Sequence, residues 1–308
     1  MRRLCLVLIA LVAAAFCLYL VYVYPRYVKV CGGDYGLKGK FECIYREDPD
    51  FRAAVDELRK MVLDPEEPFD KERAFVLFNK VLSRLGLPEM PYHLFRYGKS
   101  VREKALQVPP SPACRSPPPG FSLSIVQPHE DVANGNGLEA VYLCTFEEGG
   151  RTIVEVTLVF RDEDKPQPNS AEDLWYDVWR LVAWGRVEDI ETFFVYLYGS
   201  KAIVKFEGLA LVLEGSMGLR EIAPIGSGSK SFYSSAHVND EGSSNLKELT
   251  VYVNTWNHAL GLRDNNPAMT KDVFSLSDLS VRVGSRLDAE NEYSSLKYAA
   301  EIRVVGAG

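Results

Sequence analysis

The sequence predicts an α+β fold, mainly an antiparallel β-sandwich that follows a helical region and an N-terminal transmembrane helix. Three observations predict it: one long apolar run near the N-terminus, apolar residues at helical spacing over residues 49–85, and many short strand-like segments after a proline-rich stretch. We therefore expect a membrane anchor at residues 1–25 and a juxtamembrane and helical region at 26–107. A proline-rich linker at 108–120 and the sandwich domain at 121–308 complete the chain.

Composition narrows the class of protein. The chain has 308 residues, which is enough for one large domain or two small ones. Its 47% hydrophobic and 25% charged residues are typical of a globular protein. The formal net charge of −7 argues against general nucleic-acid binding, which requires a basic face. We expect no nucleic-acid partner.

The apolar run Leu4–Tyr24 contains no charged residue. About 20 such residues cross a bilayer as a helix. A cleaved signal peptide is an alternative, but its apolar core is usually shorter and ends at small residues, whereas Tyr22–Pro25 follow here. Arg2 and Arg3 favour an inside N-terminus. We expect a single-pass protein of the cell membrane with its C-terminal domain outside the cytoplasm; a buried soluble helix is the remaining alternative.

Four cysteines lie outside the apolar run, at positions 31, 43, 114 and 144. An even number in an extracytoplasmic domain predicts at least one disulfide among them. Four cysteines allow three connectivities, which the sequence leaves open, and free buried thiols are the alternative. A zinc site is disfavoured because the chain lacks a Cys-x-x-Cys pair.

The region before the linker should be helical. Residues 25–48 are rich in glycine and charge and predict an irregular segment. Apolar spacing predicts helices at Pro49–Leu63 and at Asp70–Leu85, the second ending at Gly86. Pro91–Leu106 is a weaker third helix. Six prolines in residues 108–120 predict an extended segment that separates the two regions.

The remainder predicts short strands and turns. Glu147–Gly150 should be the turn of a hairpin between Leu138–Phe146 and Thr152–Phe160. Ser170 should cap a helix, with Asp173 at the capping-box position. Further strands are expected at Phe121–Val126, Gly185–Tyr198, Ala202–Phe206, Leu209–Leu213, Leu249–Val253, Val273–Val283 and Leu296–Val305, with a long Gly/Ser-rich loop at Gly215–Asn245.

The stretch Gly185–Tyr198 carries the main candidate site. Because strand side chains alternate, Asp189 and Glu191 share one face, about 6–7 Å apart along the rim of a strand that is apolar on both faces. Two unpaired carboxylates there would repel each other and lose hydration, so they require a cation. A salt bridge to Arg186, Arg180 or a distant lysine is one source. Calcium or magnesium is another, and a catalytic carboxylate pair is a third reading.

Two later segments carry the remaining polar candidates. His237 lies among serines in the long loop, where a polar loop histidine and a serine–histidine pair are the alternatives. The chain lacks the Gly-x-Ser-x-Gly motif that would support the pair. His258 should be a hydrogen-bonded structural residue that fixes the turn Asn254–Asn257. Trp256 is either a core cap or a surface-binding aromatic.

In this order, the three segments resemble motifs of a β-sandwich group. The group includes the vacuolar protein sorting-associated family numbered sixty-two and the necrosis- and ethylene-inducing proteins. Its first motif reads Gly-His-Arg-His-Asp-Trp-Glu or His-x-Gly-Asp-Trp-Glu, its second Tyr-Ser-x-His, and its third Val-Val-Tyr-Val-Ala-x-Gly-Ser-His-Ala. The matching residues, over about Ser170–Asp264, are Gly185, Asp189, Glu191, Tyr233, Ser234, His237, Val251, Tyr252, Val253, His258 and Ala259.

The resemblance implies a divalent-cation site. In the necrosis-inducing proteins the first histidine, the aspartate and the glutamate of the motif hold the ion, together with an upstream aspartate. Here Asp189 and Glu191 match, and Asp177 lies about one position from the upstream aspartate. Arg186 replaces the histidine, and an arginine cannot ligate a metal. The candidate ligands are therefore Asp189, Glu191, Asp177 and His237.

Two functions follow. The first is a non-enzymatic, membrane-anchored binding or envelope module with a protein or glycan partner; it needs no cofactor. The second is a divalent-cation-dependent hydrolase or lytic protein with its site at Asp189 and Glu191. No catalytic residue is assigned, and calcium or magnesium is the only cofactor that the sequence suggests.

Overall fold

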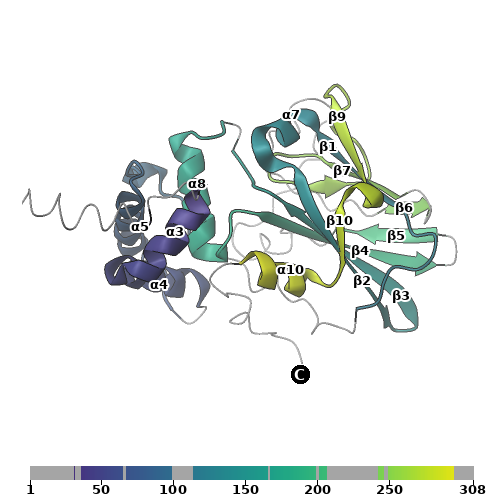
Figure 1. The fold of residues 1–308 in the computed structure, drawn as a ribbon, viewed down its shortest axis with the longest axis horizontal. Coiled ribbons are helices and arrows are strands. Elements are labelled where there is room, and N and C mark those ends of the chain that lie inside the picture. The colour runs from purple at the N-terminus through teal and green to yellow at the C-terminus, as the bar shows by residue number, and fades with distance from the viewer. Residues whose placement is uncertain are drawn as a thin grey trace, which may run out of the picture. The chain divides into compact units, whose positions relative to one another are not determined.

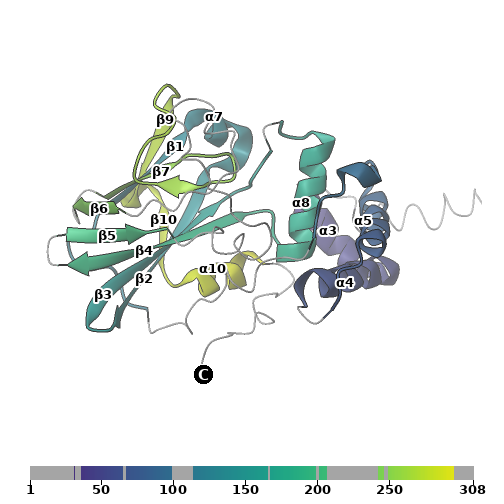
Figure 2. The same ribbon diagram turned by 180° about the vertical axis from the view of Figure 1, so that it is seen from behind.

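A computed structural model describes residues 31, 36–64, 67–98, 114–165, 167–198, 201–206, 242–245 and 249–294 (Figures 1 and 2). The chain divides into two compact units, Met1–Leu58 with Asp70–Phe95, and Arg59–Phe69 with Arg96–Gly308. The predicted anchor, residues 215–241 of the loop that carries His237, and the strands expected at residues 209–213 and 296–305 lie outside the described residues. The last four residues of that predicted loop, 242–245, are instead a strand. Within the described ranges, no helix has the length and hydropathy of a membrane span.

The first unit is helical, with α3 (Gly36–Glu47), α4 (Pro49–Leu63) and α5 (Lys71–Leu85). Asp70 caps α5 by accepting a hydrogen bond from the backbone N–H of Arg73, and Gly86 ends the helix at a φ of 72°. The two predicted helices over residues 49–85 are therefore confirmed. Phe41 of α3 packs edge to face on Phe51 of α4, with ring centroids 5.2 Å apart.

Two predictions for this region were wrong. Residues 36–47 are a helix rather than an irregular segment, because Phe41, Cys43 and Ile44 share one buried face that the two glycines of the segment obscure. The weaker third helix is replaced, over residues 91–98, by a single 3₁₀ turn at Tyr92–Leu94. The residue before this turn, Pro91, is extended.

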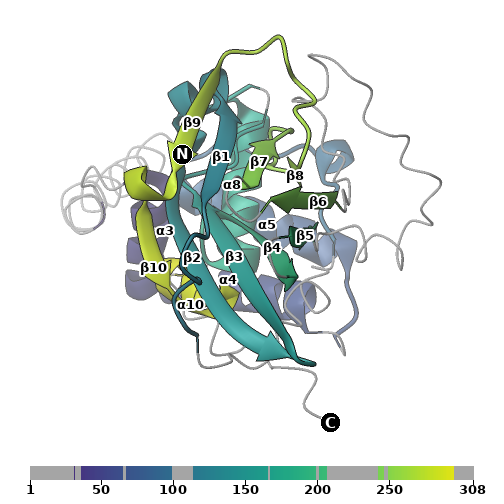
Figure 3. The same ribbon diagram turned by 90° about the vertical axis from the view of Figure 1, so that its right-hand side faces the viewer.

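The second unit is built on two mostly antiparallel sheets (Figure 3). In the described residues the larger sheet has the order β10-β2-β3-β4-β5-β6 and the smaller one β8-β7-β1-β9. Among the described strands, only β1–β7 and β10–β2 are parallel neighbours. The strands are β1 (Leu123–Pro128), β2 (Leu138–Glu148), β3 (Arg151–Phe160), β4 (Asp189–Tyr198), β5 (Lys201–Lys205), β6 (Gly242–Asn245), β7 (Leu249–Val253), β8 (Leu260–Gly261), β9 (Lys271–Ser275) and β10 (Ser280–Val283).

The hairpin of β2 and β3 confirms its prediction. Gly149 and Gly150 form its two-residue turn with φ values of 56° and 74°, which glycine adopts without a steric cost. β4 lies between β3 and β5, so it is a central strand as predicted. The segment expected as one strand at residues 273–283 is instead two strands, β9 and β10, in different sheets.

The facing sides of the two sheets share one hydrophobic core. Ile125 and Val251 from the smaller sheet belong to the same buried cluster as Val156 and Phe193 from the larger one. The chain is therefore an α+β protein in which the two sheets are arranged compatibly with the predicted sandwich. Burial of such side chains stabilises the fold by roughly 1.5–3 kcal/mol each.

The two longer helices that lie wholly within this unit are α8 (Ala171–Trp184) and α10 (Arg286–Tyr293). Ser170 caps α8 by accepting a hydrogen bond from the backbone N–H of Asp173, and Gly185 ends it at a φ of 70°. The second helix, α10, was not predicted because most of its residues are polar. Its buried Ala289 and Tyr293 cluster with apolar residues on the side of the larger sheet away from the shared core.

Both pairs of cysteines form disulfides, which confirms the prediction and gives the connectivity. Cys31 is bonded to Cys43, and Cys114 to Cys144. The second bond joins the middle of the proline-rich segment to β2, where Arg115 also exchanges two backbone hydrogen bonds with Thr145.

Candidate functional site

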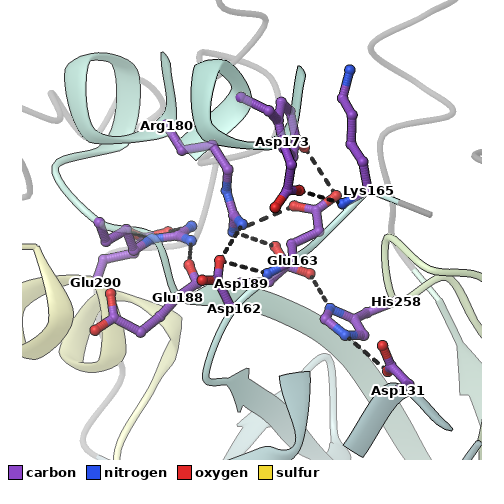
Figure 4. A network of polar contacts seen from close by, with 12 residues as sticks. Asp131, Asp162, Glu163, Lys165, Asp173, Arg180, Glu188, Asp189, His258 and Glu290 are labelled. Atoms are coloured by element: carbon purple, nitrogen blue, oxygen red, sulfur yellow. Dashed lines mark hydrogen bonds and ion pairs between the residues drawn. The ribbon is translucent and has the colours of Figure 1, made fainter. Parts of the chain in front are cut away.

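The candidate site lies where β4 begins. Asp189 is the first residue of this strand, three residues after the turn that follows α8. Figure 4 shows its carboxylate between two cationic side chains, Arg180 from α8 and His258 from the loop after β7. All three side chains are buried, so their charges are shielded from water. Charges in such surroundings are stable only when they are paired.

Arg180 is the centre of one half of this network. Its guanidinium lies 3.5 Å from carboxylate oxygens of both Asp162 and Asp189, and 3.3 Å from Glu163. The ring of Tyr176, one helical turn earlier on α8, lies 5.6 Å from the guanidinium carbon. One guanidinium therefore serves three carboxylates.

His258 is the centre of the other half. Its Nδ1 lies 2.9 Å from Asp189, its Nε2 lies 3.4 Å from Asp131, and its ring stacks on Phe160 with centroids 3.9 Å apart. Burial alone would lower the pKa of His258, but the carboxylates of Asp131 and Asp189 outweigh burial and raise it to about 10. The ring is therefore an imidazolium at neutral pH.

Hydrogen bonds within the loop around His258 fix the orientation of its ring. His258 has a φ of 54°, in the left-handed region that is uncommon for residues with a side chain. Its backbone N–H donates to the carbonyl of Thr255, whose hydroxyl accepts from the N–H of Ala259. Asn254 and Ala259 close the turn with a 2.8 Å backbone hydrogen bond. These bonds agree with the predicted structural role of His258.

Asp131 reaches His258 from the turn that follows β1. It belongs to α7 (His129–Asp131), which continues into a π-helical turn at Val132–Asn136. The side-chain amide of Gln127 donates to Asp131 at 2.5 Å, and that of Asn136 donates to it at 3.1 Å. Contacts among β1, β4 and the loop after β7 thus connect the two sheets.

The protonation of these acids differs with their partners. Burial would raise the pKa of Asp189, but the hydrogen bond to His258 and the charge of Arg180 hold it well below its usual range. Burial and the neighbouring Asp189 raise the pKa of Glu163 to about 7, despite Arg180 and the hydroxyl of Tyr176, which donates to it at 3.0 Å. Glu163 is therefore partly protonated at neutral pH.

Arg186 does not neutralise Asp189, contrary to one of the alternatives. Its guanidinium makes two hydrogen bonds to Glu290 of α10, at 3.0 and 3.1 Å, and also donates to the backbone carbonyl of Glu188. Arg180 makes the predicted salt bridge instead. Asp189 thus has two cationic partners, Arg180 and His258.

Glu191 lies on the same face of β4 as Asp189 but takes no part in the network. It is half-buried and, within the described residues, makes neither a hydrogen bond nor an ion pair. Burial and the nearby Asp189 raise the pKa of Glu191 well above its usual value. It is the one predicted rim residue that keeps an unengaged carboxyl group among the described side chains.

The other candidates are dispersed. Asp177 is buried on α8; burial and Asp162 raise its pKa to about 8, and its Oδ1 has no hydrogen-bond partner in the described part of the chain. Trp256 is half-buried and packs edge to face on Tyr176, 6.0 Å between centroids, as a core cap would. His237 lies outside the described residues.

The described carboxylate, histidine and cysteine side chains form no group of three that could hold a metal ion. Asp189 and Glu191 are two residues apart on β4, and in the described part of the chain Asp177 makes neither a hydrogen bond nor an ion pair with either of them. Because His237 was one of the four candidate ligands and is not described, the calcium or magnesium site stays a prediction.

Sequence reasoning missed Asp131, Glu163 and Glu290. Asp131 and Glu163 each follow a strand end, and Glu290 lies on the helix that was not predicted. The spacing of Gln127 and Asp131, four residues apart, is a weak local signal for their hydrogen bond. Their contacts with His258, Arg180 and Arg186 bridge long sequence separations.

Comparisons of the chain with protein-family models, with curated proteins and with solved structures found no match.

Proposed function

We propose that the chain is a single-pass membrane protein whose extracytoplasmic β-sandwich domain is a non-enzymatic binding module of the cell envelope. The N-terminal run Leu4–Tyr24 anchors it, and the domain binds a protein or glycan partner.

The observation that carries this proposal is the pairing of Asp189. A metal-dependent site would use this carboxylate as a ligand, but His258 and Arg180 already balance its charge at 2.9 and 3.5 Å. The network is also buried, with His258 at 0% exposure, so a substrate cannot contact it without local opening of the fold. A buried, ion-paired network of this kind supports a structural role, in which it holds the two sheets together.

The two disulfides support the location. Cys31–Cys43 and Cys114–Cys144 use all the cysteines outside the apolar run. Structural disulfides persist in oxidising compartments and are rare in the cytosol. The charge pattern of Arg2 and Arg3 before the apolar run agrees with a C-terminal domain on the outer side.

We also propose that the chain is a divergent relative of the β-sandwich group described above. Asp189 of the first motif and His258 of the third are 69 residues apart in sequence and form a 2.9 Å contact. Motifs that meet in space support a shared local architecture more strongly than their order alone. The group's activity is not carried over, because a common fold hosts many functions.

The anchor and the binding role are tested together in cells that express the full-length chain. We expect the protein to stay with membranes after a high-salt, alkaline wash, with residues 1–25 intact, and its disulfide-bonded domain to be accessible to a protease added outside. Saturable binding of envelope fragments to the purified full-length protein in detergent should survive both a chelator and Glu191→Gln. Release into the soluble fraction contradicts the anchor.

The second candidate is the cation-dependent hydrolase or lytic protein, and Glu191 is the observation that favours it. A half-buried carboxyl group with a raised pKa and no partner among the described residues can act as a general acid. Cleavage of envelope polymers, or lysis of vesicles, that is lost both in Glu191→Gln and after chelation would establish this candidate and displace the binding module.

A further inference from the structure

The turn after β1 contains two consecutive Asn-Gly pairs, Asn134–Gly135 and Asn136–Gly137. An asparagine followed by glycine is chemically labile, because glycine has no Cβ to keep its backbone nitrogen away from the preceding carboxamide. Neither pair takes part in the proposed function. They offer a direct comparison, since the local sequence is the same and only the surroundings differ.

The first pair is open to solvent. Asn134 and Gly135 are both exposed, and within the described residues the side chain of Asn134 has no hydrogen-bond partner. Gly135 interrupts the helical backbone with a φ of 108°, and a Cβ placed on it would meet no atom within 4 Å. The carboxamide of Asn134 and the nitrogen of Gly135 are thus free of packing that would oppose their approach.

The second pair is buried and constrained by hydrogen bonds and packing. Asn136 is 3% exposed; its side-chain amide donates to Asp131, and its carbonyl accepts a 2.8 Å hydrogen bond from Gln127. The carbonyl of Gly137 accepts from the N–H of Arg161 at 3.1 Å. A Cβ on Gly137 would lie 3.3 Å from the side chain of Val132, so this peptide is packed as well as hydrogen-bonded.

We propose that Asn134 is a site of spontaneous deamidation and that the fold protects Asn136 from the same reaction. The nitrogen of Gly135 attacks Cγ of Asn134; the new N–C bond forms as the bond to the side-chain nitrogen breaks, and ammonia leaves with the proton from the Gly135 amide. Water then opens the succinimide. Attack at Cγ gives aspartate, and attack at the main-chain carbonyl carbon gives isoaspartate. The net change is the gain of water and the loss of ammonia.

The modification reaches the buried network through Asp131. This residue lies three positions before Asn134 in the same turn and contacts His258 (Figure 4). Isoaspartate routes the main chain through the former side chain and lengthens the turn by one carbon, and both products add a negative charge beside an already acidic network. Ageing at Asn134 therefore weakens the contact between Asp131 and His258 and lowers the stability of the domain.

The test follows the two asparagines in one sample. Purified full-length protein in detergent is incubated at mildly alkaline pH and sampled over days by peptide mapping, with electron-transfer fragmentation to identify isoaspartate. We expect conversion at Asn134 to be more than about tenfold faster than at Asn136, because Asn136 must await local opening. In denaturant, with the disulfides intact, the two rates should agree to within about threefold because the protection is lost.

Three results would overturn the inference. Conversion of Asn136 as fast as Asn134 in folded protein contradicts protection, and an amide at Asn134 that persists in folded protein while it converts in denaturant contradicts exposure. The third concerns the consequence: the isoaspartate fraction, separated by ion exchange, should melt below unmodified protein. An unchanged melting temperature refutes the link to the network. Asn134→Ser is the matched control, in which position 134 should show no mass change and the protein should keep its melting temperature on the same incubation.

Discussion

Replacing Asp189 with asparagine tests the network most directly. The substitution keeps the shape of the side chain and removes its charge, which leaves Arg180 and His258 buried beside a neutral group. Removing one partner from a buried ion pair costs about 3–5 kcal/mol. Here each cation keeps a second carboxylate, since Arg180 still contacts Glu163 and His258 still contacts Asp131. We therefore expect a loss near the lower end, about 3 kcal/mol.

A second effect also reduces the stability that Asp189→Asn should lose. Asp189 helps to raise the pKa of Glu163, so its removal lets Glu163 ionise more fully and pair with Arg180. For a domain of this size, about 3 kcal/mol lowers the melting temperature by roughly 6–12 °C. The measurement is a thermal melt of residues 26–308, which include both disulfides, at neutral pH with and without calcium.

Asp272→Asn is the matched control. Asp272 also pairs with a histidine, His129 at 3.0 Å, but the two side chains are 34% and 59% exposed. Such a surface pair contributes less than about 1 kcal/mol. An Asp189→Asn variant that melts within about 2 °C of the wild type would refute the buried-network argument. Calcium that raises the wild-type melting temperature, with the effect lost in Asp189→Asn, would establish the metal reading instead.

Three further predictions concern single features of the same unit. Burial raises the pKa of Glu191 above its ordinary value of 4.5, so its protonated form stabilises the fold and this stability is lost as pH rises; Glu191→Gln should remove that loss and melt increasingly above the wild type toward alkaline pH in paired melts. His258, with a folded pKa of about 10, contributes stability that is complete below pH 6.5 and lost between 6.5 and about 10; its ring protons in an NMR titration should therefore stay those of an imidazolium at pH 8, and a midpoint near 6.5 would contradict the two-aspartate arrangement. Replacing Cys114 and Cys144 by serine opens a loop of 30 residues and should cost about 3.6 kcal/mol in a denaturant titration, and a cost below about 1 kcal/mol would contradict the chain-entropy argument.

Local chemistry explains which parts of the fold the sequence predicts. The turn of β2 and β3 follows from Gly149–Gly150, and α8 follows from its cap at Ser170 and its end at Gly185, since each signal lies within a few residues of the structure it determines. The helix α3 was missed because two glycines conceal its buried face. Its helical form is consistent with the packing of Phe41 and with the disulfide from Cys43, which both depend on distant residues.

From the sequence alone, one could predict that Asp189 requires a cationic partner, but not which residue that partner is. The alternation of β4 places Asp189 on a buried face, and burial demands a cation; both steps need nothing beyond neighbouring residues. The identity of the cation depends on contacts across 9 residues to Arg180 and 69 to His258. Arg186 lies within the motif and closer to Asp189 in sequence than Arg180 does, but its side chain is directed to Glu290 on α10, which was not predicted.

Arg186→His distinguishes the metal site that the resemblance implies from the ion-pair network that the structure contains. The resemblance predicts that a histidine at this position restores a metal ligand beside Asp189. The structure predicts a different outcome, because Arg186 is 3% exposed and holds Glu290, which is 0% exposed, through two hydrogen bonds. A histidine is too short to replace both bonds, and a buried carboxylate would lose its main partner apart from Arg286.

We therefore expect Arg186→His to destabilise the domain by about 3 kcal/mol and to bind calcium no better than the wild type. The double variant Arg186→His with Glu290→Gln removes the carboxylate that has lost its contact with Arg186 and should recover part of that loss, because a neutral amide is cheaper to bury than a carboxylate. Thermal melts of the three proteins with and without calcium separate the cases. A gain of calcium-dependent stability in Arg186→His that disappears when Asp189 is also replaced would mean that Asp189 can still act as a metal ligand once the competing arginine is removed.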